Sequence, residues 1–250
     1  MLFVDHSPSD LAEVKAAHPE IECLRFPKGK DRAYELLGTL RDLFGKDTIS
    51  AEDSLRLDST RTKQIVAVQL ETVSPESFLQ QAGGKLSLNV SKNPDPRALE
   101  LVNKTNQFNL NGKCHTETSW SAYLSDPEVF LMLAWYEDKY GPLGKIAVLA
   151  GRYLDEKLLR DVWVMSCRAF SRRIEHACLL HLLNHFQAKE LRFDFIPTQR
   201  NRPHQDFVAG ISGTVPAAGM SVSGETVLKN SPPLYFTVEQ ENSWIPSTAS

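Results

Sequence analysis

The sequence lacks several features that would assign it to a simple class. No apolar run approaches the roughly 18–20 residues that a membrane helix needs, and the first residues show no basic-then-apolar signal pattern. The four cysteines form no CxxC pair, so neither a disulfide framework nor a zinc site is indicated. A net charge of -3 argues against a dedicated nucleic-acid-binding protein. We therefore expect a cytoplasmic protein with free thiols and without a nucleic-acid or membrane partner.

The 250 residues suffice for one large or two small domains with a buried core. The first part, residues 1–49, predicts the order β-α-β-α. Its strands are expected at residues 1–5 and 21–26, and its helices at residues 8–17 and 31–44. Parallel strands bury both faces and need neighbours, so this part is expected to be a remnant of a larger doubly wound domain. Residues 50–72 are charged and predict a linker or an exposed helix.

Residues 73–240 predict a second domain, a mixed sheet flanked by helices, and residues 241–250 a frayed tail. The whole chain is thus of the α/β (α+β) class. Strands are expected at residues 85–90, 129–135, 145–152 and 234–238, and helices at 76–81, 97–105 and 201–208. The turn DKYGPLG, residues 138–144, should join two strands into a hairpin. The segment NKTNQFNLN, residues 103–111, is rich in amides that are costly in a helix and natural in a turn.

The central unit runs from residue 159 to residue 198. Apolar residues predict a strand at 159–167, a helix that begins at Ile174, and a second strand at 191–196. A strand, a helix and a strand form a crossover whose helix N-terminus attracts anions. The turn before that helix carries Cys167, Arg168, Ser171, Arg172 and Arg173.

This strand, RxxSxR turn and helix resemble the acyl-coenzyme A site of the GNAT acyltransferase fold. The family's turn carries Arg or Gln, two residues, Gly, one residue, and then Gly or Ala. Ser171 and Arg173 stand where the glycines would be. The resemblance implies that Ser171, Arg172 and Arg173 bind phosphate or pyrophosphate. Because glycine lets the backbone approach a pyrophosphate closely, we expect weak binding of coenzyme A.

The chain also resembles the C-terminal part of FkbH-like proteins, which join a HAD-type phosphatase domain to a GNAT-like domain. Those proteins are associated with loading a glyceryl unit from a phosphorylated glycerate onto an acyl carrier protein. The matching segments are NKTNQFNL, the DKYGPLG turn (D-x-F-G-x-x-G in the family), MSCR with the following Glu175, and PTQRN at residues 197–201. The resemblance implies a GNAT-like domain at residues 73–240 and an acyl carrier protein as partner.

The segment FVDHSPSDLAEV, residues 3–14, resembles the last HAD motif, which implies that residues 1–49 are a HAD-like remnant. Asp5 would be the vestigial magnesium-side carboxylate, and His6 replaces a second aspartate. No Asp-x-Asp nucleophile motif occurs near the start of a strand. We expect no phosphatase activity, and a role for magnesium only if a partner supplies the upstream half of the HAD domain.

Two residues are candidates for catalysis. Cys167 ends a strand beside Arg168, where a cation and a helix dipole favour the thiolate; the alternative is a buried small apolar residue. His204, expected in a loop facing the same cleft, is the candidate general base. Cys178 is expected in the core. His176, His181 and His185 are expected at solvent or rim positions, as a weak metal signal.

Substrate binding is assigned to polar residues around the same cleft. Neutral amides supply both hydrogen-bond donors and acceptors, so they suit glyceryl hydroxyls or a carbonyl oxygen; the alternative is a loop built on its own amides. The candidates are Asn106, Gln107, Asn109, Arg168, Thr198 and Asn201.

Three functions follow from these features. The first is glyceryl or acyl transfer to an acyl carrier protein, with Cys167 as the residue that carries the acyl group covalently. No cofactor is certain for it; the candidates are the carrier's phosphopantetheine and coenzyme A. The second is coenzyme A-dependent N-acetyltransfer, disfavoured by Ser171 and Arg173. The third is an inactive binding module or a truncated gene product.

Overall fold

The computed structural model describes residues 2–44, Leu55 and residues 73–242. The chain divides into two compact units, residues 1–50 and residues 51–250. Apart from Leu55, the linker expected at residues 50–72 lies outside the described residues, as do residues 243–250 of the expected tail. None of the described helices is both long and apolar enough to cross a membrane.

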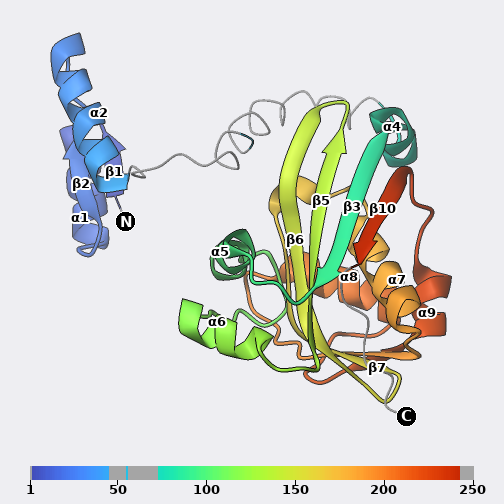
Figure 1. The fold of residues 1–250 in the computed structure, drawn as a ribbon. Coiled ribbons are helices and arrows are strands. Elements are labelled where there is room, and N and C mark those ends of the chain that lie inside the picture. The colour runs from blue at the N-terminus through green and yellow to red at the C-terminus, as the bar shows by residue number, and fades with distance from the viewer. Residues whose placement is uncertain (1, 45–54, 56–72, 243–250) are drawn as a thin grey trace. The chain divides into compact units, whose positions relative to one another are not determined.

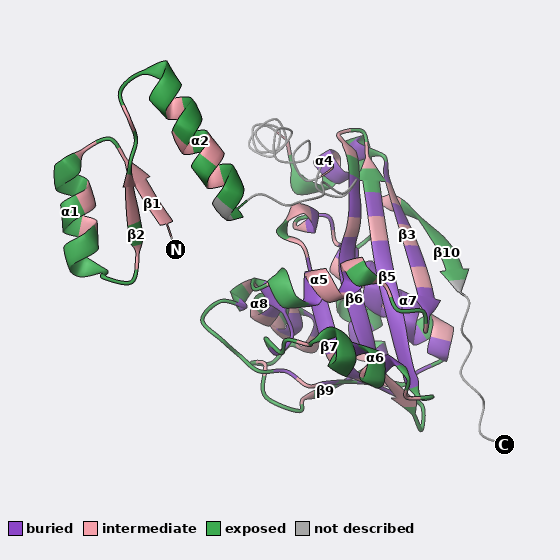
Figure 2. Cartoon of the chain, turned by 60° about the vertical axis from the view of Figure 1, so that its left-hand side comes forward, coloured by how far each residue is buried: buried purple, intermediate pink, exposed green. Residues whose placement is uncertain are grey.

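The N-terminal unit follows the predicted order of β1 (Leu2–Asp5), α1 (Pro8–Ala17), β2 (Glu22–Arg25) and α2 (Lys30–Phe44). The two strands pair in parallel, and Ser7 caps α1 by accepting a hydrogen bond from the Asp10 backbone. None of the residues in this unit whose burial is described is buried, which Figure 2 shows as green and pink ribbon. Two strands and two helices thus form secondary structure here without a closed core.

The C-terminal unit holds the remaining described elements (Figure 1). In chain order they are α4 (Pro75–Ala82), β3 (Gly84–Ser91), α5 (Pro96–Lys104), β4 (Phe108–Asn109), α6 (Glu117–Leu124), β5 (Val129–Asp138), β6 (Gly141–Leu154), β7 (Lys157–Met165), the 3-10 turn η1 (Cys167–Ala169), α7 (Ile174–Phe186), β8 (Glu190–Phe193), α8 (Arg202–Ser212), β9 (Ser221–Ser223), α9 (Gly224–Asn230) and β10 (Phe236–Asn242).

One mixed sheet organises this unit, in the order β10-β3-β5-β6-β7-β8-β9, with β4 added to β7. Strands β3, β5, β6 and β7 form an antiparallel meander. Two pairs are parallel, β10 with β3 and β7 with β8. The predicted mixed α+β class is therefore confirmed, and the predicted unit of strand, helix and parallel strand is β7, α7 and β8.

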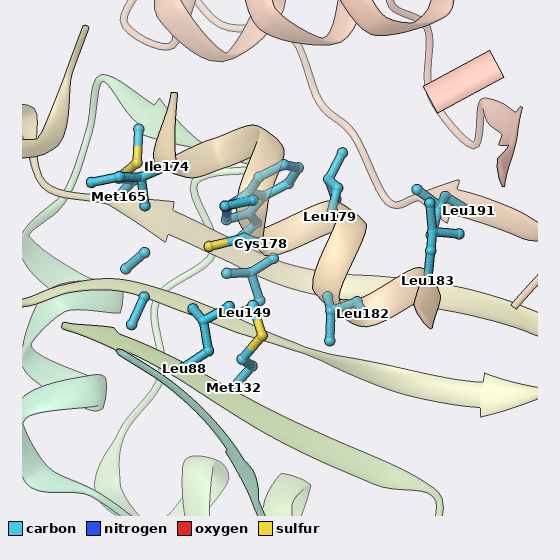
Figure 3. Packing of buried hydrophobic residues seen from close by; sticks show 14 of the residues in the cluster. Leu88, Met132, Leu149, Met165, Ile174, Cys178, Leu179, Leu182, Leu183 and Leu191 are labelled. Atoms are coloured by element: carbon cyan, nitrogen blue, oxygen red, sulfur yellow. The ribbon is translucent and has the colours of Figure 1, made fainter. Parts of the chain in front are cut away.

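The sheet is covered on both faces, which makes its central strands apolar on both sides. Along β5, Met132 belongs to the cluster with α7, α8 and α9, whereas its neighbours Leu131 and Leu133 belong to the cluster with α5 and α6. Figure 2 shows the central strands in purple, with α5 and α6 on one face. Cys178 is fully buried, as predicted, and Figure 3 shows it on α7 close to Leu149.

Several details differ from the sequence prediction. Strands β5 and β6 pair as far as Asp138 and Gly141, so most of the expected turn at residues 138–144 belongs to β6. Helices α6 and α9 and the short strands β4 and β9 were not predicted. Helix α6, ETSWSAYL, is rich in weak helix formers and begins with a capping box at Thr116. His181 is buried rather than at the rim, because α7 packs against both the sheet and α9.

Amide hydrogen exchange should separate the two units. Exchange should be fast in β1 and β2, where the described side chains are only partly covered, and slow at Val162–Val164, which are at most 4% exposed. The measurement is exchange followed by mass spectrometry at two protein concentrations. Protection in β1 and β2 that equals that of β7 at both concentrations would contradict the expectation.

Candidate functional site

The loop between β7 and α7 has a backbone conformation that suits glycine better than the residues it contains. Ser171 has a φ of 66° and Arg173 a φ of 62°, both in the left-handed region. In the turn of the GNAT acyltransferase fold, which this loop resembles in sequence, glycines stand at these two positions. Holding an L-residue there costs on the order of 1 kcal/mol, so surrounding contacts must hold the loop in place.

The arginines of this loop supply those contacts. The buried Arg172 donates from Nε to Asp138 Oδ2 at 3.0 Å and from Nη1 to the Arg168 carbonyl at 3.0 Å. Arg173 donates from Nη1 to the Pro233 carbonyl at 2.9 Å and pairs with Glu76 on α4. Arg172 is thus buried with its carboxylate, and Arg173 is engaged with Glu76 and Pro233. Neither guanidinium group is free for the phosphate that the sequence assigns to it, so phosphate binding here stays a prediction. Ser171, the third residue expected to bind phosphate, has an exposed side chain.

Beyond this loop, the parallel strands β7 and β8 separate after a short paired stretch. They pair only from Lys157 to Arg160. Farther along, β7 pairs with β4, and Leu110 donates to the Trp163 carbonyl at 2.9 Å and accepts from Ile196 at 3.1 Å. Residues 108–111, which we call the plug, thus lie between β7 and the chain that follows β8. Ligands of open α/β sheets often bind where the carboxyl ends of such strands diverge, and here the protein itself fills that place.

Buried amides hold the plug. Asn109 donates from Nδ2 to the Thr105 carbonyl at 2.8 Å, and its Oδ1 accepts from the backbone of Gly112 at 2.8 Å. Asn201 donates from Nδ2 to the carbonyls of Asn109 and Ile196, both at 2.9 Å. Its Oδ1 accepts from Thr198 N at 2.8 Å. Both asparagines were expected to bind substrate, but their side chains are used within the fold.

The other predicted binding residues are more accessible. Asn106, Gln107 and Thr198 are exposed. The Thr198 hydroxyl accepts from the backbone of Asn201 at 3.2 Å and thereby shapes the turn before α8. The half-buried Arg168 donates from Nε to Ser166 Oγ at 3.3 Å. Of the assigned amides, only Asn106 and Gln107 keep exposed side chains.

His204 does not occupy the place expected for a general base. It lies on α8 with no exposed surface, and its ring stacks on Phe108 of the plug with centroids 4.3 Å apart. Burial, assisted by the nearby Arg160 charge, lowers the pKa of His204 to about 3. The prediction that His204 faces a cleft shared with Cys167 is wrong, because α8 buries the ring against the sheet.

Cys167, in contrast, is exposed, and all four cysteines are free. The alternative of a buried apolar residue is thereby excluded for Cys167. It opens the 3-10 turn η1, which Ser166 separates from the end of β7, and α7 begins only at Ile174. The thiol therefore lies at the start of the loop and not at the N-terminus of α7 itself.

A cleft of about 450 Å³ lies at the other end of the same loop. Its wall comes from the first turn of α7, from α8, and from the chain around the end of α9. The lining residues are Glu175, His176, Pro203, Asp206, Phe207, Gly210, Asn230 and Pro232. The two titratable residues on α7 distinguish this cleft from a simple surface hollow.

Glu175 and His176 are both partly buried in the wall of the cleft. Oxygen Oε2 of Glu175 is buried without a hydrogen bond to a described residue. Burial raises the pKa of Glu175 to about 7, although its own backbone N–H and Arg173 oppose the shift. Burial likewise lowers the pKa of His176 to about 4, and its ring meets Phe207 edge-on at 4.9 Å. Near neutral pH, Glu175 can therefore take up or release a proton while His176 stays uncharged.

Sequence reasoning did not assign a role to either residue. Glu175 was noted only within the resemblance, and His176 was expected at a solvent or rim position. The available signal was a carboxylate in the first helical turn directly after Ile174 and two arginines. Its burial depends on α9, which the sequence did not predict, and on the side of α8 that carries Phe207.

The predicted magnesium position has few ligands. Asp5 Oδ1 accepts from the backbone of Ser7 at 2.7 Å and lies 3.3 Å from His6 Nδ1. Within the part of the chain that the structure describes, no three His, Cys, Asp or Glu side chains gather as metal ligands. The described surroundings of Asp5 therefore do not fit a magnesium site on their own.

Comparison with protein-family models gives no match for this chain, and comparison with curated proteins gives none either. The likeness to FkbH-like proteins therefore stays an expectation.

Replacing Asn201 should loosen the plug. Asn201→Ala removes two donated and two accepted hydrogen bonds and leaves buried backbone groups unpaired. The free energy of unfolding should fall by roughly 2–4 kcal/mol. Urea unfolding measures this, with the exposed Asn106→Ala as the matched control, expected to change stability by less than about 0.5 kcal/mol. Equal stability of the two variants would contradict the assigned role of Asn201.

The raised pKa of Glu175 should appear as a pH dependence of stability. The folded state holds a proton on Glu175 up to a pKa of about 7, whereas the unfolded value is 4.5. The folded state then binds more protons between these values, so stability falls as the pH rises through this window. Glu175→Gln cannot ionise, so it should match the wild type at about pH 4 and exceed its stability by on the order of 2 kcal/mol at about pH 8.

The measurement is urea unfolding at both pH values, with the exposed Glu225→Gln on α9 as control. The control should change stability by less than about 0.5 kcal/mol at either pH. A Glu175→Gln effect that is the same at both pH values would show that ionisation of Glu175 does not oppose folding.

Proposed function

We propose that this chain transfers an acyl group, of the glyceryl type, to the thiol of an acyl carrier protein. The observation that carries the proposal is the pairing, at the two ends of one loop, of an exposed thiol and a cleft with a titratable carboxyl group. Cys167 begins that loop, and Glu175 lines the cleft just after its end. The mixed α+β sheet that positions both is consistent with a GNAT-like acyltransferase, which stays part of the proposal.

The chemistry requires two exchanges at one carbonyl carbon. The Cys167 thiolate attacks the acyl donor, a carbon–sulfur bond forms, and the donor's leaving group departs with the electron pair. The carrier's thiol then loses its proton, attacks the new thioester and releases the Cys167 thiolate. Thioester exchange between two thiols is nearly balanced in energy, so catalysis rests on positioning and proton transfer. A carboxyl group with a pKa of about 7, such as Glu175, can accept and return that proton near neutral pH.

The surroundings favour a carrier-bound arm over free coenzyme A. A pyrophosphate at the start of α7 would meet the Glu175 carboxyl group, and the guanidinium groups of Arg172 and Arg173 are already engaged. The phosphopantetheine arm of a carrier protein is neutral along most of its length. It therefore suits a cleft whose His176 is uncharged and whose walls include Phe207 and two prolines. Coenzyme A-dependent N-acetyltransfer is the weaker alternative.

A non-catalytic binding module is the second candidate, and two observations favour it. The plug fills the divergence of β7 and β8, and His204 is buried rather than available as a base. In that case the cleft would hold the carrier's arm, or another neutral chain, without transfer. The N-terminal unit would then contribute only binding surface.

A HAD-half partner that completes β1 and β2 is a further element of the proposal, and magnesium would enter only with that partner. We place this activity in the cytoplasm, where the four cysteines would stay reduced.

Intact-protein mass spectrometry tests the acyl transfer. Incubation with a glyceryl–pantetheine thioester should give a hydroxylamine-sensitive adduct on Cys167, because its thiol is exposed and a thioester donor matches its chemistry. The adduct should pass to an added carrier protein. Glu175→Gln should leave formation of the adduct unchanged and slow its transfer to the carrier near neutral pH by roughly 100-fold, because Glu175 is the base that takes the proton of the carrier's thiol.

Cys114→Ala provides the matched control, since Cys114 is the second exposed thiol. The adduct should persist in Cys114→Ala and disappear in Cys167→Ala. Equal labelling of both thiols would mean non-specific acylation. An unlabelled Cys167 in a protein that still binds the carrier would support the binding module instead.

A further inference from the structure

Arg160 is a fully buried cation without a partner of opposite charge among the described residues. Its side chain has no exposed surface, and none of its three guanidinium nitrogens has a hydrogen-bond partner in the described part of the chain. The guanidinium carbon lies 3.5 Å from the centroid of the Phe193 ring and 5.3 Å from that of Trp163. The indole Nε1 of Trp163 is likewise buried, without an acceptor among the residues that the structure describes. The cluster therefore offers several donors and no carboxylate.

Such an arrangement is costly unless something neutralises it. Burial lowers the pKa of Arg160 well below its usual value, yet a guanidinium is too basic to be expected to lose its proton in a protein. Contact with aromatic faces stabilises a desolvated cation only modestly, whereas an uncompensated buried charge is strongly destabilising. The aromatic contacts of Arg160 alone do not balance the charge.

The position of Arg160 in the sheet suggests where the missing anion belongs. Arg160 and Phe193 form the last pair of β7 and β8, at the point where the two parallel strands diverge. Phe108 of the plug covers this region by contacting Trp163 and His204, with ring centroids 5.4 Å and 4.3 Å away. The donors of Arg160 thus lie at the closed end of the divergence that the plug fills.

We propose that Arg160 binds the carboxylate of a small organic acid at this point between β7 and β8, beside the plug. The planar guanidinium forms two parallel hydrogen bonds to a carboxylate, and the Trp163 indole N–H is a further donor of the same cluster. Because the Arg160 side chain has no exposed surface and packs against Phe193 and Trp163, the rest of the acid is small and compact. Access requires local displacement of the plug. This site is separate from the cleft at Glu175 and does not depend on the proposed acyl transfer.

Thermal unfolding of the full chain tests the site, with sodium acetate as the probe and sodium chloride at equal ionic strength as the reference. Acetate that binds only the folded protein should raise the unfolding midpoint by roughly 2–4 °C when its concentration is about five times the dissociation constant. Arg160→Met should abolish this shift. It should also unfold at a higher temperature than the wild type in chloride, because it removes the uncompensated charge.

Arg192→Met is the matched control, since Arg192 lies on β8 with its side chain exposed; it should keep the full acetate shift. Arg160→Lys is the second variant, which keeps the charge but not the planar fork, and its shift should be smaller than that of the wild type. An acetate shift that is the same in the wild type, Arg160→Met and Arg160→Lys would overturn the proposal. Equal stabilisation of the wild type by chloride and by acetate would also overturn it. A third contradicting result is an Arg160→Met protein that is less stable than the wild type, with no acetate shift in either protein.

Discussion

The early separation of β7 and β8 is the constraint on which the rest of the C-terminal unit depends. Parallel strands that part after Arg160 leave backbone donors and acceptors that cannot stay unpaired inside a protein. The plug satisfies them, because Leu110 bonds to Trp163 on one side and to Ile196 on the other. A segment far away in the sequence thereby becomes part of the sheet, and its amides serve the fold rather than a ligand.

This arrangement also determines which polar side chains remain accessible to a ligand. With the divergence filled, the accessible functional groups lie around the loop from Cys167 to Glu175. Its left-handed residues, Ser171 and Arg173, are held by ion pairs that reach α4 and β5. The guanidinium groups of Arg172 and Arg173, which could have bound an anionic ligand, instead hold the loop in place. In the cleft at the start of α7, burial favours the neutral forms of two lining side chains, Glu175 and His176.

The sequence predicted the helices and strands better than it predicted the roles of the side chains that they carry. Apolar periodicity located β7, α7 and β8, because a buried strand and an amphipathic helix each have a local signature. The density of amides marked residues 103–111 as unusual, but the bond from Asn201 to Asn109 joins residues 92 positions apart, and no local pattern reveals such a partner. Glu175 was missed as a site residue for the same reason, since its burial comes from distant elements. Arg160 reads as an ordinary polar residue of a strand until the face it occupies is known.

One side chain connects the two unusual electrostatic sites. Phe207 on α8 lines the cleft and meets His176 at 4.9 Å, while its ring also lies 5.3 Å from Trp163 and 5.8 Å from Phe108. Trp163 in turn contacts Arg160. Any displacement of the plug at Phe108 therefore changes a wall that the cleft shares. A ligand can shift the balance between the plug in place and the plug displaced only if it binds one of these states more tightly than the other. An anion at Arg160 would bind the displaced state more tightly, because it neutralises a charge that the closed plug leaves buried.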